Sequence, residues 1–323
     1  MKISVVIPTY NAADTLIRAV DSVLAQNQPV HEILIIDDGS TDNTAEIVHQ
    51  YGERIRYFYQ QNKGLAVAMN AGIELARGEC IGILAADDEW LPNFVMSHIR
   101  LISKNPDAKW TYCCHEDVTQ HGHQRIQIPL AVKEQIEREG FLSYFRAHMA
   151  GFYFGTCGFI IRRSVFDEVG KFDSEMRNGM DWDLWDRIAL RYPRVAVCPN
   201  VCWRYYRDNP NCLHRRGRGC RDLQLKSVCR NMRRARELGP GVVSDYRPHA
   251  RILAMRYLMR WAARDCSIEY DTVEDAKHVL TLTVRERGLL RILRLLPKPI
   301  ASRVAGRFIP LLNTKFRRVL MSP

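Results

Sequence analysis

The feature that most constrains the fold is a regular alternation of short apolar segments with longer amphipathic ones in the N-terminal third. The apolar segments have the length of strands, and EILII at 32–36 is nearly continuous, as in a strand buried on both faces. Between them, Asp14 and Asp42 are expected to cap helices and Gly78 to end one. This alternation predicts a parallel sheet covered by helices on both faces. The predicted strands are 3–7, 32–36, 55–59 and 80–84, and the predicted helices are 14–25, 42–49, 64–76 and one beginning near Pro92.

The rest of the chain changes character twice. Residues 105–207 mix both kinds of segment, with strands predicted at 110–114, 158–161, 195–197 and 203–206 and helices at 134–148 and 182–191. After about residue 214 the strand signals stop, and helices are predicted at 219–237, 247–264, 272–283 and 285–296. We therefore expect an α/β fold, with a Rossmann-like, mostly parallel sheet over 1–214 (halves of about 1–104 and 105–214) and a helical region over 215–323.

The charge of the chain is concentrated in its C-terminal third. Lys and Arg number 47 against 36 Asp and Glu, but residues 215–323 alone hold 25 basic and 9 acidic residues. A basic segment suits nucleic acid, an anionic membrane surface or an acidic substrate. A solvated Arg-rich helical surface, which needs no partner, is the other interpretation.

The chain shows no export or membrane signal. It has no run of about 18 uncharged apolar residues, and the N-terminal MKISVVIPTYNA is typical of a strand and loop rather than a signal peptide. The ten cysteines are irregularly spaced. Together these features predict a cytoplasmic protein with reduced thiols.

Two pairs of adjacent carboxylates follow predicted strands. Asp37-Asp38 comes after 32–36 and Asp87-Asp88 after 80–84, so both pairs are expected at the carboxyl edge of the sheet, where ligands bind. Adjacent carboxylates repel unless a cation or hydrogen bonds offset their charge. A hard divalent ion shared with substrate phosphates would offset this repulsion. The alternative interpretation is that these aspartates stabilise turns or cap helices.

Seven motifs in order resemble a known family. They are PTYN at 8–11, DDGSTD at 37–42, QNKGLAVAMNAG at 61–72, AADDEW at 85–90, VFDEVGKFDSEM at 165–176, MDWDLWDRI at 180–188 and YYRDNPN at 205–211. In this order they resemble the inverting nucleotide-sugar glycosyltransferases of family 2, which have the glycosyltransferase A fold. The resemblance covers about residues 1–214.

The resemblance implies a role for each matching residue. Tyr10 would stack on the nucleotide base, Asp37 would accept a hydrogen bond from it, and Asp87 would contact the ribose or sugar. Asp88 would bind the Mn²⁺ or Mg²⁺ that bridges the two phosphates, and Arg207 would add a second cation there. The full set of expected donor-binding residues is Pro8, Thr9, Tyr10, Asp37, Asp38, Lys63, Asn70, Asp87 and Arg207.

Asp181 is the expected general base. It would take the proton of the acceptor hydroxyl as that oxygen attacks the anomeric carbon opposite the leaving group, which inverts the configuration. Asp183 is the competing candidate, and the N-cap of the helix 182–191 is the structural alternative for Asp181. The family usually has Glu where this chain has Met180, and many members have Asp where it has Ala85.

Cysteines and a histidine late in the chain could form a zinc site, but their spacing argues against it. The set is Cys198, Cys202, Cys212, His214 and Cys220, and only the first two form a closely spaced pair. Those two are expected to flank a short strand. Cys113, Cys114 and Cys157 are expected in the core.

The motifs favour an enzyme that moves one sugar from a nucleotide sugar, by default UDP-linked, to a cell-envelope or lipid-linked saccharide. The processive members' Gln-x-x-Arg-Trp motif is incomplete, because Tyr257 stands at the Gln position before Arg260 and Trp261. The alternatives are a sugar nucleotidyltransferase, disfavoured because PTYNAAD lacks a Gly-rich loop, and a basic nucleic-acid-binding protein, disfavoured because the sheet edge is acidic.

The last segment, 285–323, predicts a contact with the inner face of the cell membrane. Arg287, Arg291, Arg294 and Lys298 recur at helical spacing opposite a stripe of Leu289, Ile292, Leu293 and Leu296. A basic amphipathic helix is typical of a membrane surface. A terminal helix docked on the body through its leucines is the alternative.

Overall fold

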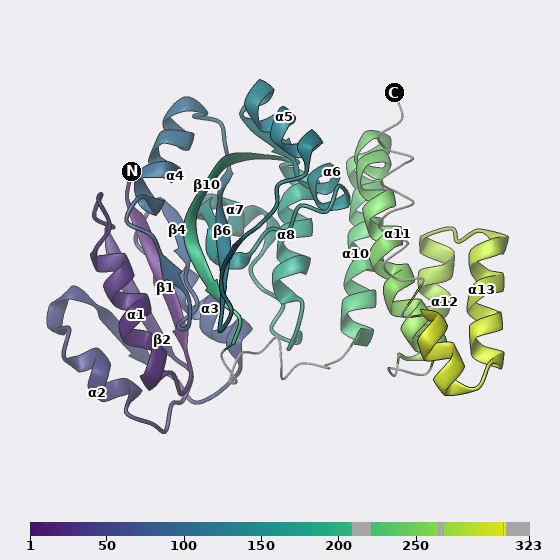
Figure 1. The fold of residues 1–323 in the computed structure, drawn as a ribbon, viewed down its shortest axis with the longest axis horizontal. Coiled ribbons are helices and arrows are strands. Elements are labelled where there is room, and N and C mark those ends of the chain that lie inside the picture. The colour runs from purple at the N-terminus through teal and green to yellow at the C-terminus, as the bar shows by residue number, and fades with distance from the viewer. Residues whose placement is uncertain (209–220, 264–265, 267, 306, 308–323) are drawn as a thin grey trace. The chain divides into compact units, whose positions relative to one another are not determined.

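The computed structural model describes residues 1–208, 221–263, 266, 268–305 and 307, and only the backbone of 221, 222, 284 and 285 (Figure 1). It divides into two compact units. Unit 1 comprises 1–143, 153–177 and 194–217, and unit 2 comprises 144–152, 178–193 and 218–323. The boundary predicted at 214–215 lies outside the described residues.

Unit 1 is an α/β unit built on one sheet. Within the described residues, its strands run in the order β3-β2-β1-β4-β9-β6-β10-β5, with β7 beside β6 and β8 beside β10 (Figure 1). The first four are parallel, as predicted, whereas β9 runs antiparallel to both β4 and β6. The strands are β1 (Ile3–Thr9), β2 (Glu32–Asp37), β3 (Arg56–Tyr59), β4 (Cys80–Ile83), β5 (Glu89–Trp90), β6 (Trp110–Thr119), β7 (Gly122–Arg125), β8 (Phe141–Ser143), β9 (Phe159–Arg162) and β10 (Arg194–Tyr206).

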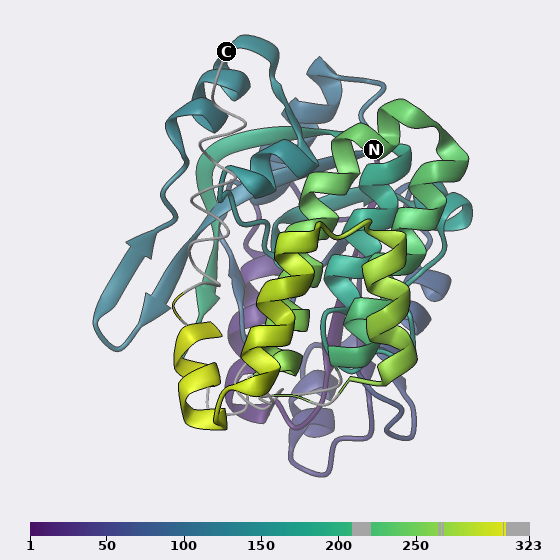
Figure 2. The same cartoon turned by 90° about the vertical axis from the view of Figure 1, so that its right-hand side faces the viewer.

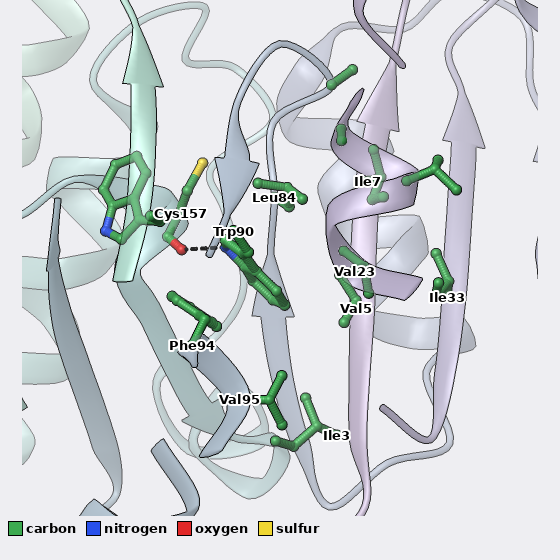
Figure 3. Packing of buried hydrophobic residues seen from close by; sticks show 14 of the residues in the cluster. Ile3, Val5, Ile7, Val23, Ile33, Leu84, Trp90, Phe94, Val95 and Cys157 are labelled. Atoms are coloured by element: carbon green, nitrogen blue, oxygen red, sulfur yellow. Dashed lines mark hydrogen bonds between the residues drawn. The ribbon is translucent and has the colours of Figure 1, made fainter. Parts of the chain in front are cut away.

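Helices cover both faces of this sheet. Successive side chains of β1 point to opposite faces, so each face offers apolar side chains against which a helix can pack. Figure 3 shows Val5 and Ile7 beside Val23 of α1, and Trp90 beside Phe94, with the Trp90 indole N–H donating to the Cys157 carbonyl at 2.9 Å. On the other face a Cβ at Gly72 of α3 would meet Val6 at 2.2 Å, so only glycine allows this approach. The helices of unit 1 are α1 (Ala13–Leu24), α2 (Thr44–His49), α3 (Leu65–Leu75), α4 (Phe94–Lys104), α5 (Leu130–Glu139) and α7 (Arg163–Val169).

Two predictions for the second half of unit 1 are wrong in detail. The single helix expected at 134–148 is broken, because Gly140 takes the left-handed conformation (φ 68°) after α5, and β8 follows. The strands expected at 195–197 and 203–206 are one strand, β10, which stays paired to β6 through register shifts.

Unit 2 is helical. Its helices are α6 (Tyr144–Met149), α8 (Met180–Arg191), α10 (Arg221–Leu238), α11 (Pro240–Ala262), α12 (Tyr270–Val279) and α13 (Val284–Leu295). Helix α10 packs against α8, α11 and α12, and α11 packs against α13. Figure 2 shows α8 in teal, α10 and α11 in green, and α12 and α13 in yellow. Thr283 begins α13 with a capping box formed with Glu286. None of the described helices is both long and apolar enough to cross a bilayer.

The helix boundaries differ from the sequence signals at three acidic residues and one glycine. Asp14 lies inside α1, whose N-cap is Ala12, and Asp181 lies inside α8, whose N-cap is Gly179. Asp42 precedes α2 and accepts from the amides of both Thr44 and Ala13, so it serves the starts of two helices. Gly78 follows the end of α3 at Leu75 and is required for another reason, because a Cβ there would lie 2.7 Å from the Ser4 amide nitrogen.

Candidate active site

The parallel pairing of β1 and β2 brings their carboxyl ends together, with Thr9 opposite Asp37. The loops that follow are joined by hydrogen bonds. The Asn11 amide donates to Ser40 Oγ at 2.9 Å, and Asn11 Oδ1 accepts from the Thr41 amide at 2.8 Å. This edge is therefore a fixed polar surface, as the positions of the motifs predicted.

The carboxylates of Asp37 and Asp38 are buried and accept hydrogen bonds from the loops around them. Asp37 accepts from the Ser40 amide at 2.8 Å and from the Tyr57 hydroxyl at 2.6 Å. Asp38 accepts from Gln60 Nε2 and from two loop amides. The pair thus holds the segment before α3 in place. The predicted contact of Asp37 with a base stays a prediction, and a carboxylate has the lone pairs to accept further hydrogen bonds.

The carboxylate of Asp88 has a different environment. It is 2% exposed and accepts from the Cys157 thiol at 3.1 Å and from the Tyr206 amide at 3.1 Å. Burial, and then the charge of Asp87, raise the pKa of Asp88 well above its usual value. The hydrogen bonds from one amide and one thiol, together with the charge of Arg18, compensate only part of the cost of burying this carboxylate beside a second one.

Three side chains to which the sequence assigned no role at the carboxylates surround this pair. The Arg18 guanidinium of α1 donates to the Asp87 carbonyl at 2.6 Å and lies 3.7 Å from the centre of the Tyr206 ring. Burial and the Asp88 charge raise the pKa of Cys157, so its thiol stays protonated and donates. The only signal in the sequence is an arginine between the apolar positions Leu16 and Ala19 of α1.

The other predicted donor residues of unit 1 fall into two groups. Tyr10 is 48% exposed and Lys63 is exposed, so both can meet a ligand, whereas Pro8 and Thr9 are buried at the end of β1. Asn70 uses both ends of its amide on the backbone of Phe172, at 2.8 and 2.9 Å. In the structure Asn70 therefore ties α3 to the segment before unit 2, and its predicted place near the diphosphate stays a prediction.

Arg207 follows β10 and pairs with a carboxylate on β6. Its Nε lies 2.7 Å from Asp117 Oδ2, and its guanidinium lies 5.0 Å from the centre of the Tyr205 ring. A phosphate bound by Arg207 would either share the guanidinium with the Asp117 carboxylate or displace that carboxylate. The remaining residues of the YYRDNPN motif, from 209 on, lie outside the described residues.

In unit 2 the structure separates the two candidates for the general base. Asp183 is buried: it pairs with Arg187 Nε at 2.8 Å and accepts from the Ser227 hydroxyl of α10. Asp181, one residue into the first turn of α8, is partly exposed and accepts from the Trp182 amide at 3.0 Å. Asp183 is thus committed to holding α8 against α10, which leaves Asp181 as the candidate for proton transfer.

The residues at the end of β4 fit a hard divalent cation. Asp87 and Asp88 offer carboxylate oxygens, which Mg²⁺ and Mn²⁺ prefer. Burial and the charge of Asp87 raise the pKa of Asp88, and a bound cation would offset both effects. Asp88 accepts fewer hydrogen bonds than Asp38, and its carboxylate adjoins that of Asp87, which points to this pair rather than to Asp37-Asp38.

Comparison with solved structures agrees on the fold. Staphylococcus aureus TarS superposes with a TM-score of 0.68 at 15% identity, over 98% of this chain and 54% of TarS. A shorter TarS form, solved in complex with UDP-GlcNAc, gives 0.67 over 97% of this chain and 90% of that form. The mannosyltransferase PcManGT from Pyrobaculum calidifontis, solved with GDP-Man and Mn²⁺, gives 0.53 at 16% identity over 99% of this chain and 88% of that protein.

Sequence comparison gives the family. An uncharacterized glycosyltransferase of Rickettsia typhi is 32% identical over 57% of this chain and 57% of its own length, so the match spans little more than half of that relative. The putative teichuronic acid biosynthesis glycosyltransferase TuaG of Bacillus subtilis is 45% identical over 27% of this chain and 36% of its own length. The profile of Glycosyl transferase family 2 matches residues 4–170, which is more than half of the chain, and the chain therefore belongs to this family.

Proposed function

We propose that the chain is a metal-dependent, inverting glycosyltransferase that moves one sugar from a nucleotide sugar to a hydroxyl group of a saccharide. The observation that carries this proposal is the Asp87-Asp88 pair after β4, where a buried carboxylate with a raised pKa adjoins a second carboxylate. Family membership supports sugar transfer as the reaction class.

Different residues at this edge of the sheet would bind the metal, the base and the charge of the donor. Asp88, with Asp87 beside it, would hold Mn²⁺ or Mg²⁺, which supplies positive charge to the departing nucleoside diphosphate. Tyr10, exposed after β1, would stack on the base. Arg18, held at the Asp87 carbonyl, keeps a permanent positive charge beside the pair and limits its repulsion.

We assign the proton transfer to Asp181. A general base must be accessible to the acceptor hydroxyl. Asp181 is partly exposed, whereas Asp183 is buried against Arg187 and Ser227. The inverting outcome follows from a single displacement with one base.

We also propose a specific nucleotide for the donor and a specific class of acceptor, which family membership alone does not give. UDP is the default nucleotide, supported by the likeness in fold to TarS, which was solved with UDP-GlcNAc. A cell-envelope or lipid-linked saccharide is the proposed acceptor, supported by the similarity to TuaG, whose name refers to teichuronic acid biosynthesis.

The proposal is tested by measuring nucleoside diphosphate release from a panel of nucleotide sugars, with Mn²⁺ and with EDTA. We expect metal-dependent turnover of one donor, lost in Asp88→Asn. Asp107→Asn is the matched control, because Asp107 is an exposed acid before β6, at the opposite end of the strands. Equal turnover by Asp88→Asn and Asp107→Asn, or full turnover in EDTA, would overturn the metal assignment.

We also propose that α13 and the turn after it contact an anionic membrane surface. The structure splits the predicted stripe, because Leu293 is buried with Leu290 whereas Ile292 is 58% exposed. Exposed apolar and basic side chains therefore share the outer surface of this segment: Arg287, Arg291, Ile292, Leu295, Lys298 and Ile300. Arg294 is also exposed, and its guanidinium lies 4.4 Å from the Trp261 ring. The end of the predicted segment 285–323, from residue 308 on, lies outside the described residues.

A further inference from the structure

Three cysteines of unit 1 bring their sulfur atoms together away from the carboxylate pairs. Cys113 lies on β6, and Cys198 and Cys202 lie on β10. The three Sγ atoms all lie within 4.8 Å of one another. Cys113 and Cys202 are buried, and Cys198 is partly exposed. An ion could therefore reach the group from the side of Cys198.

The group exists because β10 is irregular at this point. Residues four apart in a regular strand are separated by about 13 Å. Cys198 pairs with Cys113, but the register then shifts between Cys198 and Val201 and again between Val201 and Trp203. Cys202 is one of the residues left without a partner on β6. Bulges of this kind shorten and bend a strand and redirect side chains, which is how Cys202 returns to the other two sulfurs.

Hydrogen bonds from neighbouring groups hold two of the sulfurs. The Asn200 amide, in the irregular segment, donates to Cys198 Sγ. The Cys202 thiol donates to the Ser97 hydroxyl of α4 at 3.6 Å, and once the thiol loses its proton to bind an ion, the same hydroxyl can donate to the sulfur. Outer hydrogen bonds orient the ligands of metal sites, whereas a cysteine that only fills space in a core does not need them.

We propose that Cys113, Cys198 and Cys202 bind a soft divalent cation, of which Zn²⁺ is the representative, through their three sulfurs. Two sulfurs on one tetrahedral zinc ion lie roughly 3.8 Å apart, because each Zn–S bond is about 2.3 Å long. The observed grouping accommodates that spacing with small side-chain movements. A water molecule or the Ser97 hydroxyl would fill the fourth position.

The ligand chemistry separates this site from the one at Asp87-Asp88. Sulfur ligands select zinc and similar ions, whereas carboxylate oxygens suit Mg²⁺ and Mn²⁺. The two sites would therefore hold different ions in the same protein.

The bound ion would act as a clamp on β10. It would join β6 to β10 just before Trp203, which pairs with Trp90 of β5, and upstream of Tyr206, whose amide donates to Asp88. A metal that binds only the folded site stabilises the fold. The clamp would thus fix the strand that supports the carboxylate pair.

The test begins with the reduced, EDTA-treated full chain titrated with Co²⁺. We expect a sulfur-to-cobalt charge-transfer absorption that saturates at one ion per chain and disappears when Zn²⁺ is added. Zn²⁺ should also raise the melting temperature of the wild-type protein.

Variants assign the absorption to this group. Cys198→Ser is the main variant, because Cys198 is partly exposed and the change is small. It should weaken Co²⁺ binding by at least about 100-fold, since even outer contacts of metal sites cost 10–100-fold, and it should remove the effect of Zn²⁺ on melting. Cys114→Ala is the matched control, because Cys114 is buried next to Cys113 on β6 and lies outside the group.

A second control separates this site from the proposed catalytic one. Asp88→Asn should keep the sulfur-to-cobalt absorption, even where it loses Mn²⁺-dependent donor turnover. The proposal is overturned if the reduced wild-type protein gives no such absorption, or if Cys198→Ser and Cys114→Ala bind Co²⁺ equally. It is also overturned if the sulfurs pair as a disulfide that forms regardless of added Zn²⁺.

Discussion

The two carboxylate pairs of unit 1 occupy equivalent places in the sheet and differ in what surrounds them. Both follow buried parallel strands, β2 and β4, at the same edge. Asp38 accepts from two backbone amides and an amide side chain, whereas Asp88 accepts from one amide and a thiol. Burial and the charge of Asp87 raise the pKa of Asp88. Hydrogen-bond donors therefore hold Asp38 to the loop before α3, and the contrast supports Asp87-Asp88 as the pair proposed to bind a cation.

The same contrast appears on α8 of unit 2. Asp183 is satisfied by Arg187, Ser227 and Asn231 and is buried, while Asp181 remains partly exposed. In both places, acids that are close in the sequence differ in burial or in their hydrogen-bond partners, and we use that difference to propose which of them take part in the chemistry.

The largest effect is expected when the Asp87-Asp88 pair is changed. Asp88→Asn should lower metal-dependent turnover by about 10⁴-fold or more, because a bound metal contributes several kcal/mol to the transition state. The fold should remain intact, since the neutral amide suits a buried position. Mn²⁺ titration of donor binding by calorimetry measures the loss. Normal Mn²⁺-dependent donor binding by this variant would contradict the contrast between the pairs.

The second prediction applies the contrast to α8. Asp181→Asn should lower kcat by roughly 10²–10⁴-fold with little change in donor affinity or melting temperature. Asp183→Asn should instead destabilise the protein by about 3–5 kcal/mol, because it leaves the Arg187 charge buried without its partner. Kinetics and thermal unfolding of both variants make the comparison. If Asp183→Asn were stable but inactive and Asp181→Asn active, the assignment would be reversed.

The third prediction concerns the satisfied pair. Asp38→Asn should cost about 1–3 kcal/mol of stability, because at least one buried amide loses its acceptor. Thermal or urea unfolding measures the change, with Asp107→Asn as the exposed control. An unchanged stability together with a specific loss of donor binding would instead make Asp38 a donor contact.

The fourth prediction is a pH dependence. Because the folded-state pKa of Asp88 is raised, the folded protein holds this proton more tightly than the unfolded chain does. In EDTA, the contribution of Asp88 to stability should therefore fall as the pH rises above the usual value near 3.8, through the raised folded-state pKa. Asp88→Asn should remove this pH-dependent loss of stability. The melting temperature of the variant should therefore rise relative to that of the wild type as the pH approaches neutrality. Parallel pH curves for the two proteins would contradict the raised pKa.

The smallest effect is expected at the outer surface of α13. Replacing Arg287, Arg291 and Lys298 with Gln should weaken binding to anionic vesicles by about 1 kcal/mol per charge. Replacing the exposed Lys2, Arg100 and Lys104 of unit 1 lowers the net charge equally and should have little effect. Co-sedimentation at low and physiological salt makes the measurement. Equal losses for both triple variants would show that net charge, and not this surface, governs binding.

Local patterns were enough to predict most elements of the fold. The parallel strands β1 to β4 were found because apolar, β-rich segments of strand length ended in polar turns. The same kind of reasoning was wrong where one residue outweighs a pattern, as at Gly140, whose left-handed conformation ends α5 within an otherwise helical segment. It was also wrong for β10, because irregular pairing with β6 keeps two predicted strands in one.

What the sequence by itself determined is the sheet, its acidic edge and the family, because these depend on residue types at short spacings along the chain. Only the tertiary structure decided which acids are satisfied, since the donors to Asp88 come from Cys157 and Tyr206, far away in the sequence. The cysteine group was decided in the same way, because Cys113 joins Cys198 and Cys202 only through the pairing of β6 with an irregular β10. Hydrogen bonding and charge compensation depend on neighbours in space, and no local pattern contains them.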